Sequence, residues 1–126
     1  MNYCTVDDVL RRASGITVDK ATTPSTADVE AWITEQSGRI DQQIQQAGWH
    51  ELPLDLDAEG AEPAAAILRA CAAAGATDLL FRAVHDNAGQ PLEGVTGWGE
   101  ERNRLMIFCM MRLPGLPVRS TLGATL

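Results

Sequence analysis

The side chains that could bind a metal or attack a substrate are few and scattered. His50 and His85 are the two histidines of the 126-residue chain, and neither has a histidine or cysteine at metal-ligand spacing. The cysteines, Cys4, Cys71 and Cys109, are odd in number and far apart, which argues against a disulfide framework or a zinc site. We expect three buried thiols, because a free cysteine packs as a small hydrophobic side chain.

Carboxylates gather in residues 51–62. Four of them are candidates for a functional acidic loop: Asp55, Asp57, Glu59 and Glu62. The order Asp-Leu-Asp-Ala-Glu superficially resembles a calcium loop, but the glycine and the closing bidentate glutamate stand at the wrong positions. A solvated acidic loop is the simpler interpretation.

Glycine and serine indicate no catalytic site either. The run 94–99 has three glycines but lacks the lysine and the preceding strand of a phosphate-binding loop. No nucleophile turn surrounds the four serines considered, which are Ser14, Ser25, Ser37 and Ser120. We therefore predict a protein that is not an enzyme and needs no metal or cofactor.

The net charge of −7 argues against tight binding of nucleic acid. Tight binding to phosphates needs clustered Lys and Arg, and the ten basic residues of this chain form no basic run. The longest strongly apolar run, residues 105–111, is far shorter than the roughly 20 residues that cross a bilayer. With no signal peptide visible, we expect a soluble protein made in a reducing cytoplasm, with no membrane partner.

Apolar periodicity predicts an all-α fold, a small bundle of about four helices with an extended acidic loop. Residues 1–113 form the helical domain and residues 114–126 a flexible C-terminal tail. A short helix begins at the cap Thr5, and a long amphipathic one covers residues 26–47. An alanine-rich helix runs from Pro63 to about His85, and a fourth spans about 99–113.

Details of these helices suggest what they contact. Glu35 and Arg39 stand one turn apart in the favourable order on the polar face of the second helix. Gly75 lies in the middle of the third, where close packing against a neighbouring helix is the obvious reason to keep it. In the stretch after the second helix, Leu52, Leu54 and Leu56 alternate with polar residues or proline, which predicts an extended segment with one buried face.

Surface residues on the third and fourth helices are candidates for contact with other chains. Asp78, Arg82 and Asp86 are one turn apart, which predicts an ion-pair ladder on an exposed strip or an intersubunit contact. The apolar run of the fourth helix wraps around it, so one bundle cannot easily cover all of it, and thioethers suit surfaces that repack. The candidate interface there is Leu105, Met106, Met110 and Met111.

Five pieces follow one another in an informative order. They are Tyr3-Cys-Thr5-Val6-Asp-Asp8-Val9, the helix Asp28-Val29…Ile33…Ile40-Asp41…Ile44, Gly48-Trp49, Leu52-Pro53-Leu54, and the alanine-rich helix that finishes Asp78-Leu79-Leu80-Phe81-Arg82. In order and spacing they resemble the small head–tail connector proteins of tailed bacteriophages, also called head-completion or adaptor proteins. The resemblance covers roughly residues 3–85.

This resemblance implies a structural virion protein, made in the host bacterial cytoplasm and located at the head–tail junction. Its partners would be the portal protein, tail or stopper proteins, and further copies of itself in a ring around a genome channel. The acidic loop would line that channel, past which DNA slides without specific binding. The tail would reach toward the portal through Leu116, Val118, Arg119, Leu122 and Leu126.

Two other hypotheses stay open. In one, the bundle is a binding module whose groove takes an amphipathic peptide of a regulatory partner, and the tail is dispensable. In the other, the acidic loop binds a metal and the protein is an enzyme.

Overall fold

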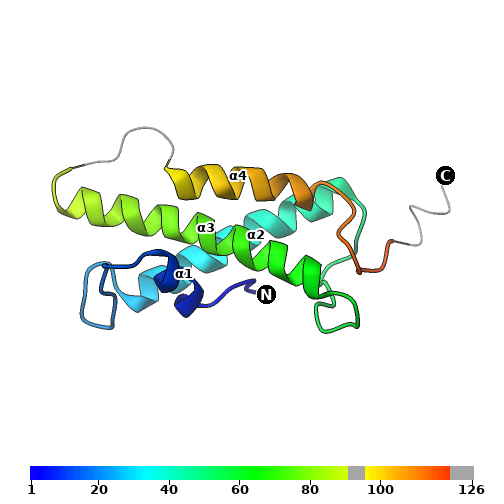
Figure 1. Cartoon of the computed structure of the whole chain (residues 1–126), viewed down its shortest axis with the longest axis horizontal. Coiled ribbons are helices and arrows are strands. Elements are labelled where there is room, and N and C mark those ends of the chain that lie inside the picture. Colours follow the sequence, from blue (N-terminus) through cyan, green and yellow to red (C-terminus); the bar gives the residue numbers. More distant parts are fainter. Residues whose placement is uncertain (91–95, 120–126) are drawn as a thin grey trace.

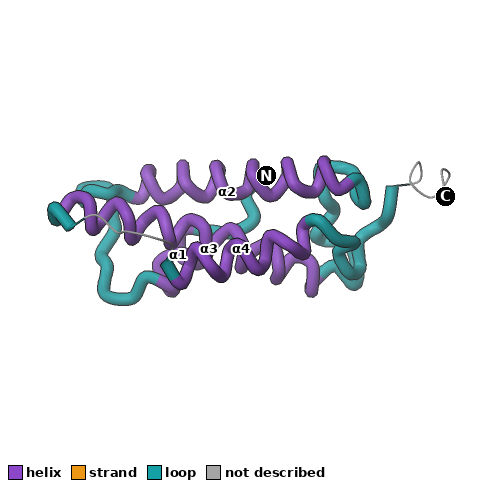
Figure 2. The backbone as a smooth tube through the Cα atoms, turned by 90° about the horizontal axis from the view of Figure 1, so that it is seen from above, coloured by secondary structure: helices purple, strands orange, loops and turns teal. Residues whose placement is uncertain are grey.

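The computed structural model describes residues 1–90 and 96–119, and the regular structure in these ranges is all helical. The helices are α1 (Val6–Arg12), α2 (Thr26–Ala47), α3 (Glu62–Asn87) and α4 (Gly97–Cys109). Helix α3 contacts each of the other three and forms the centre of the bundle (Figure 1). Seen from above, α2 runs along one side, with α3 and α4 on the other (Figure 2). The predicted all-α bundle is confirmed.

Local sequence explains where the first two helices begin. The hydroxyls of Thr5 and Ser25 accept the backbone N–H groups of Asp8 and Asp28, whose carboxylates accept the cap N–H groups in return. Each reciprocal pair satisfies two donors that a helix start would leave unpaired. Helix α2 ends where Gly48 adopts a left-handed φ of +79°, a conformation that favours glycine.

The core lies between α2 and α3. The predicted apolar stripe of α2 is buried through Val29, Ile33, Ile40 and Ile44, and it faces the small side chains of α3. A Cβ atom added to Gly75 would lie 2.2 Å from the Gln36 side-chain oxygen. The close approach predicted at this glycine is confirmed.

Helix α3 is the one helix in the described ranges that is long and apolar enough, by length and composition alone, to cross a membrane. Of its most apolar window, 61% is buried inside the bundle. The central helix of a small bundle has this same composition, because it packs against neighbours on several sides.

The predicted boundaries of α3 and α4 need correction. Helix α3 begins at Glu62, so this residue belongs to a helical first turn and not to the acidic loop. Helix α4 ends at Cys109, four residues before the predicted end. The N–H groups of Met110 and Met111 donate to carbonyls only three residues back, at 3.1 Å each, which tightens the last turn and stops the helix.

The period-two prediction for the segment after α2 is wrong in part. Residues 56–60 form turns, and Gly60 takes a φ of +87°. Of the three alternating leucines, Leu54 is buried, Leu56 is half-buried and Leu52 is exposed. We call residues 49–61 the acidic loop hereafter.

Candidate functional site

A buried carboxylate on α3 positions the start of α4. The Thr96 hydroxyl accepts the Gly99 N–H at 3.1 Å, capping α4, and donates to Asp78 at 2.5 Å. The Arg82 Nε donates to the same carboxylate at 3.2 Å. Asp78 is 5% exposed, and its carboxylate is hydrogen-bonded inside the fold.

This geometry corrects the prediction for Asp78 and Arg82. Their ion pair, one helical turn apart, exists as predicted. The Asp78 carboxylate does not lie on an exposed strip and is engaged within its own chain, whereas the Arg82 side chain is 34% exposed. The spacing of charges along α3 could not reveal that the cap of α4 would cover them.

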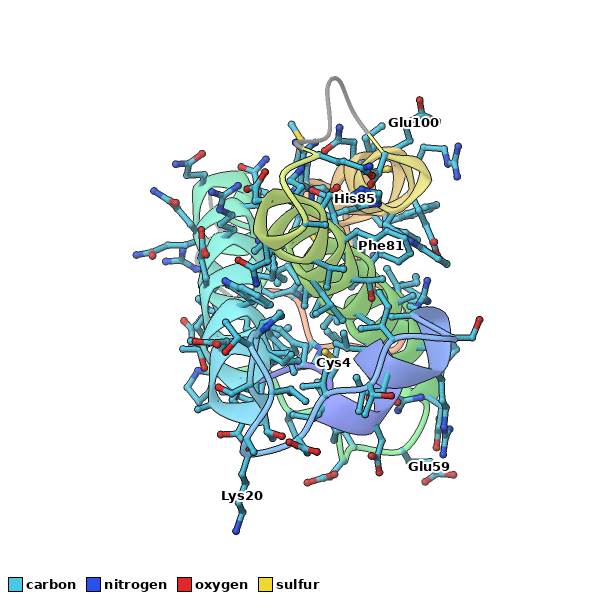
Figure 3. All side chains as sticks on the ribbon, turned by 90° about the vertical axis from the view of Figure 1, so that its left-hand side faces the viewer. Cys4, Lys20, Glu59, Phe81, His85 and Glu100 are labelled. Carbon is cyan, nitrogen blue, oxygen red and sulfur yellow. The ribbon has the colours of Figure 1, made fainter. Side chains whose placement is uncertain are left out.

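Further contacts hold α4 along its length. The Phe81 ring on α3 lies 6.4 Å from Trp98 and 6.3 Å from His85, between centroids. Figure 3 shows Phe81 and His85 together beside α4. On another side, Arg12 of α1 donates to both carboxylate oxygens of Glu101 at 2.9 Å. The helix is therefore fixed by α1 and α3 together.

The inner face of α4 completes the core. Cys109 is buried, and Leu105 and Met106 are half-buried against the core cluster. Leu105 and Met106, which we predicted as part of a partner interface, are therefore packed in part against their own bundle. They lie on the side of α4 that faces the bundle.

The outer face of α4 ends in an uncovered apolar surface. Its exposed fractions are 57% for Ile107, 46% for Phe108, 54% for Met110 and 53% for Met111. We call these residues the α4 patch. The other large apolar side chains exposed in the described ranges are Met1 and Leu52 alone, so most such surface is concentrated here.

The sequence pointed to half of this patch. Met110 and Met111 were predicted as surface residues and are exposed, whereas Ile107 and Phe108 were treated only as part of the run. The missed signal is a helical spacing in the sequence. Counted from Arg104, the apolar residues Ile107, Phe108 and Met111 come three, four and seven positions later. In the structure, Arg104, Ile107 and Phe108 share one exposed face of α4, and Met111 is exposed in the turn that follows the helix.

Residues 110–119, which we call the C-terminal extension, pack back onto the bundle around His50. The Leu113 N–H donates to the His50 Nε2 at 2.9 Å. The proton of the His50 ring is therefore on Nδ1, which donates to the Pro117 carbonyl at 2.7 Å. The Arg119 N–H donates to the Trp49 carbonyl at 2.9 Å. His50 itself is 3% exposed and has a structural role.

The boundary of the predicted flexible tail is therefore wrong. Leu116 is 5% exposed, and Val118 and Arg119 are half-buried, because a histidine distant in sequence anchors this segment. None of the three is a loose docking residue. Leu122 and Leu126, the other predicted docking residues, lie outside the described ranges.

The acidic side chains keep their predicted exposure. Asp55, Asp57, Glu59 and Glu62 all reach solvent, and Figure 3 shows Glu59 pointing outward. Within the described ranges, no group of three or more His, Cys, Asp and Glu side chains is placed to hold a metal ion. A cavity of about 310 Å³ between this loop and the extension is lined by both acidic and basic residues.

Buried titratable groups near the N-terminus are held protonated. Burial and the hydrogen bond to Asp41 raise the pKa of the Tyr3 hydroxyl. Burial, reinforced by the nearby Asp8 charge, raises the pKa of the Cys4 thiol to about 11. A protonated buried thiol is a poor nucleophile.

Comparisons of the chain with protein-family models, with curated proteins and with solved structures give no match.

Proposed function

We propose that this chain is a structural assembly protein that binds other protein chains through the α4 patch and catalyses no reaction. In the form that the resemblance implies, it is a ring-forming head–tail connector of a tailed bacteriophage. The observation that carries the proposal is the exposure of Ile107, Phe108, Met110 and Met111 in one place. Contiguous apolar surface of this kind marks interaction sites in soluble proteins.

The energetics suit an assembly contact. Fully burying one large apolar side chain contributes about 1.5–3 kcal/mol. Since each of the four is about half exposed, covering the patch would contribute roughly 3–6 kcal/mol before the costs of association. That suffices for a weak contact between two copies, and a ring multiplies such contacts around its circumference.

Charge complementarity favours a second copy as the partner. Arg104 and Arg112 are exposed next to the patch, and residues 102–119 contain no acidic residue. The acidic loop offers the reverse combination: its residues 51–61 contain four carboxylates and no Lys or Arg, around the exposed Leu52. A contact between the α4 patch of one copy and the acidic loop of the next would pair apolar with apolar and positive with negative.

Such a contact joins two different surfaces. Contacts of this type build rings when the rotation between copies closes. A ring of chains that each carry a net charge of −7 would repel phosphates and let DNA pass without adhering. These properties support the connector role over a role in DNA binding.

Light scattering over a concentration series tests the assembly. We expect the wild-type mass to rise above that of a monomer as concentration increases. The double substitution Phe108→Ser, Met111→Ser should keep the chain monomeric and folded, because both residues are already exposed. Met1→Ser is the matched control, since Met1 is 59% exposed and outside the patch.

Electron microscopy of the chain mixed with the portal protein of the same phage tests the connector role. We expect density for rings of this chain on the portal, lost with the double variant. A chain that stays monomeric at every concentration and ignores the portal contradicts the proposal. If that monomer instead binds amphipathic peptides, the binding-module hypothesis takes its place.

A further inference from the structure

Two thiols meet where α3 packs against α4. Cys71 of α3 is 0% exposed and Cys109 of α4 is 1% exposed. A side-chain contact between them shifts the pKa of each thiol, although 38 positions separate them in the chain. The third thiol, Cys4, has Asp8, Arg12 and Arg69 as its charged neighbours, and neither of the other cysteines acts on it.

Helix geometry accounts for the meeting. The Cys71 Sγ also lies 3.8 Å from the Arg102 carbonyl oxygen, so its side chain is directed at α4. Arg102 and Cys109 are seven residues apart, two turns along one helical face. Because helical carbonyls point toward the C-terminus and Cα–Cβ bonds tilt toward the N-terminus, the Arg102 oxygen and the Cys109 sulfur point toward each other along this face, with room for the Cys71 sulfur between them. The Cys71 thiol contacts both.

We propose that Cys71 and Cys109 form an oxidisable pair, a modification site at which a low-molecular-weight disulfide creates an intrachain disulfide between α3 and α4. One cysteine sulfur attacks the oxidant's disulfide, forming a mixed disulfide and releasing one small thiol. The second cysteine sulfur then attacks the mixed disulfide and releases the other small thiol. The two cysteine protons pass to the two leaving thiolates, and the oxidant takes up two electrons.

The position of Cys109 provides the route to reaction. It is the last residue of α4, followed by the exposed Met110 and Met111. Helix ends open at a lower free-energy cost than helix centres, so this turn exposes the sulfur by local opening. Contact with Cys109 and burial both raise the pKa of the Cys71 thiol, whereas contact with Cys71 lowers the pKa of Cys109, so the Cys109 sulfur is the one that attacks the oxidant first.

The consequence of the crosslink is a helix that cannot leave the bundle. A bond between residues this far apart in sequence restricts the unfolded chain and stabilises the folded one. It would also hold the last turn of α4, and with it Phe108, in place. The inference rests on the thiol contact and does not require the proposed connector role.

Oxidation of the full-length chain with oxidised glutathione at neutral pH tests the proposal. We expect the intact mass to fall by two hydrogen atoms and a non-reduced peptide map to show Cys71 joined to Cys109. The urea midpoint of the oxidised chain should rise, and reductant should reverse the rise. Cys4 should remain free to alkylation after unfolding.

Single substitutions provide the controls. Cys4→Ala should form the same crosslink, whereas Cys71→Ala and Cys109→Ala should yield at most a glutathione adduct, with circular dichroism reporting that each variant folds. The reaction is repeated in low urea, where local opening is faster. A crosslink to Cys4, disulfide-linked dimers, or no mass loss under either condition overturns the proposal.

Discussion

At the scale of single residues, Gly75 sets how closely α2 and α3 approach. The side chain of Gln36 occupies the space where a Gly75 Cβ would lie. Its Oε1 accepts a hydrogen bond from the Arg102 guanidinium at 3.4 Å. Gln36 is 1% exposed, and its amide nitrogen has no partner within the described ranges. This side chain therefore has little freedom to move aside.

Substituting Gly75 by alanine should destabilise the protein although alanine is the better helix former. The propensity gain is up to about 1 kcal/mol, whereas overpacking a tight core costs about 1–3 kcal/mol. Urea unfolding should show a lower midpoint. Gly38→Ala is the matched control, because Gly38 lies in α2 with nothing within 4 Å of its Cβ position. This control should leave stability unchanged or raise it, and equal destabilisation of both variants would refute the explanation.

Cys4 should make stability depend on alkaline pH. Its pKa rises from 9.0 to about 11 on folding, so the unfolded chain releases the proton first as pH increases. The stabilisation from this shift is complete below pH 9 and disappears as pH rises through the folded pKa, a loss of about 3 kcal/mol. Urea unfolding with reductant present, at neutral pH and between the two pKa values, should show it. Cys4→Ala should remove the Cys4 part of this dependence and leave the parts that Tyr3 and Cys71 contribute.

At the scale of elements, the helices were predictable where local chemistry decides them. The capping pairs and the apolar stripe of α2 indicate its full extent, because each residue involved acts within one or two turns. The end of α4 was not predictable in the same way. No proline or glycine stands at Cys109, and the tight turn of Met110 and Met111 accompanies an anchor on His50, some 60 positions earlier.

Replacing His50 by alanine should release the C-terminal extension. The variant loses two hydrogen bonds and leaves the buried Leu113 N–H without an acceptor, a cost of about 2–4 kcal/mol. Hydrogen exchange at the Leu113 and Arg119 amides should accelerate. His85→Ala is the comparison, since His85 is half-buried and only stacks on Phe81, and it should cost about 1 kcal/mol or less. Unchanged exchange at both amides would show that His50 is not the anchor.

At the scale of the whole molecule, the sequence predicted an excess of apolar surface but not all of its location. The apolar run at the end of α4 was correctly expected to exceed what one bundle covers. Which of its members stay outside depends on how α4 is rotated against α3, and contacts such as Asp78 with Thr96 decide that rotation. These contacts join residues from different helices, so periodicity within one helix cannot reveal them.

Charge reversal should show whether the α4 patch meets the acidic loop of another copy. The double variant Arg104→Glu, Arg112→Glu places negative charge beside the patch, opposite the negative loop. The double variant Asp55→Arg, Asp57→Arg places positive charge on the loop, opposite the positive patch. Each alone should associate roughly tenfold more weakly, because exposed ion pairs are worth up to about 1 kcal/mol each. An equimolar mixture of the two variants should associate again, since every patch then finds a loop of opposite charge. Light scattering measures all three samples.

Net charge alone could also weaken association, and a second variant separates that effect from the local one. Arg11→Glu with Lys20→Glu changes the net charge by the same amount at exposed sites on α1 and the loop after it. In Figure 3, Lys20 points away from the bundle. This control should associate like the wild type, because repulsion between charges more than about 10 Å apart is screened at moderate salt. If it weakens association as much as the patch variant does, or if the mixture fails to recover, the patch does not bind the acidic loop.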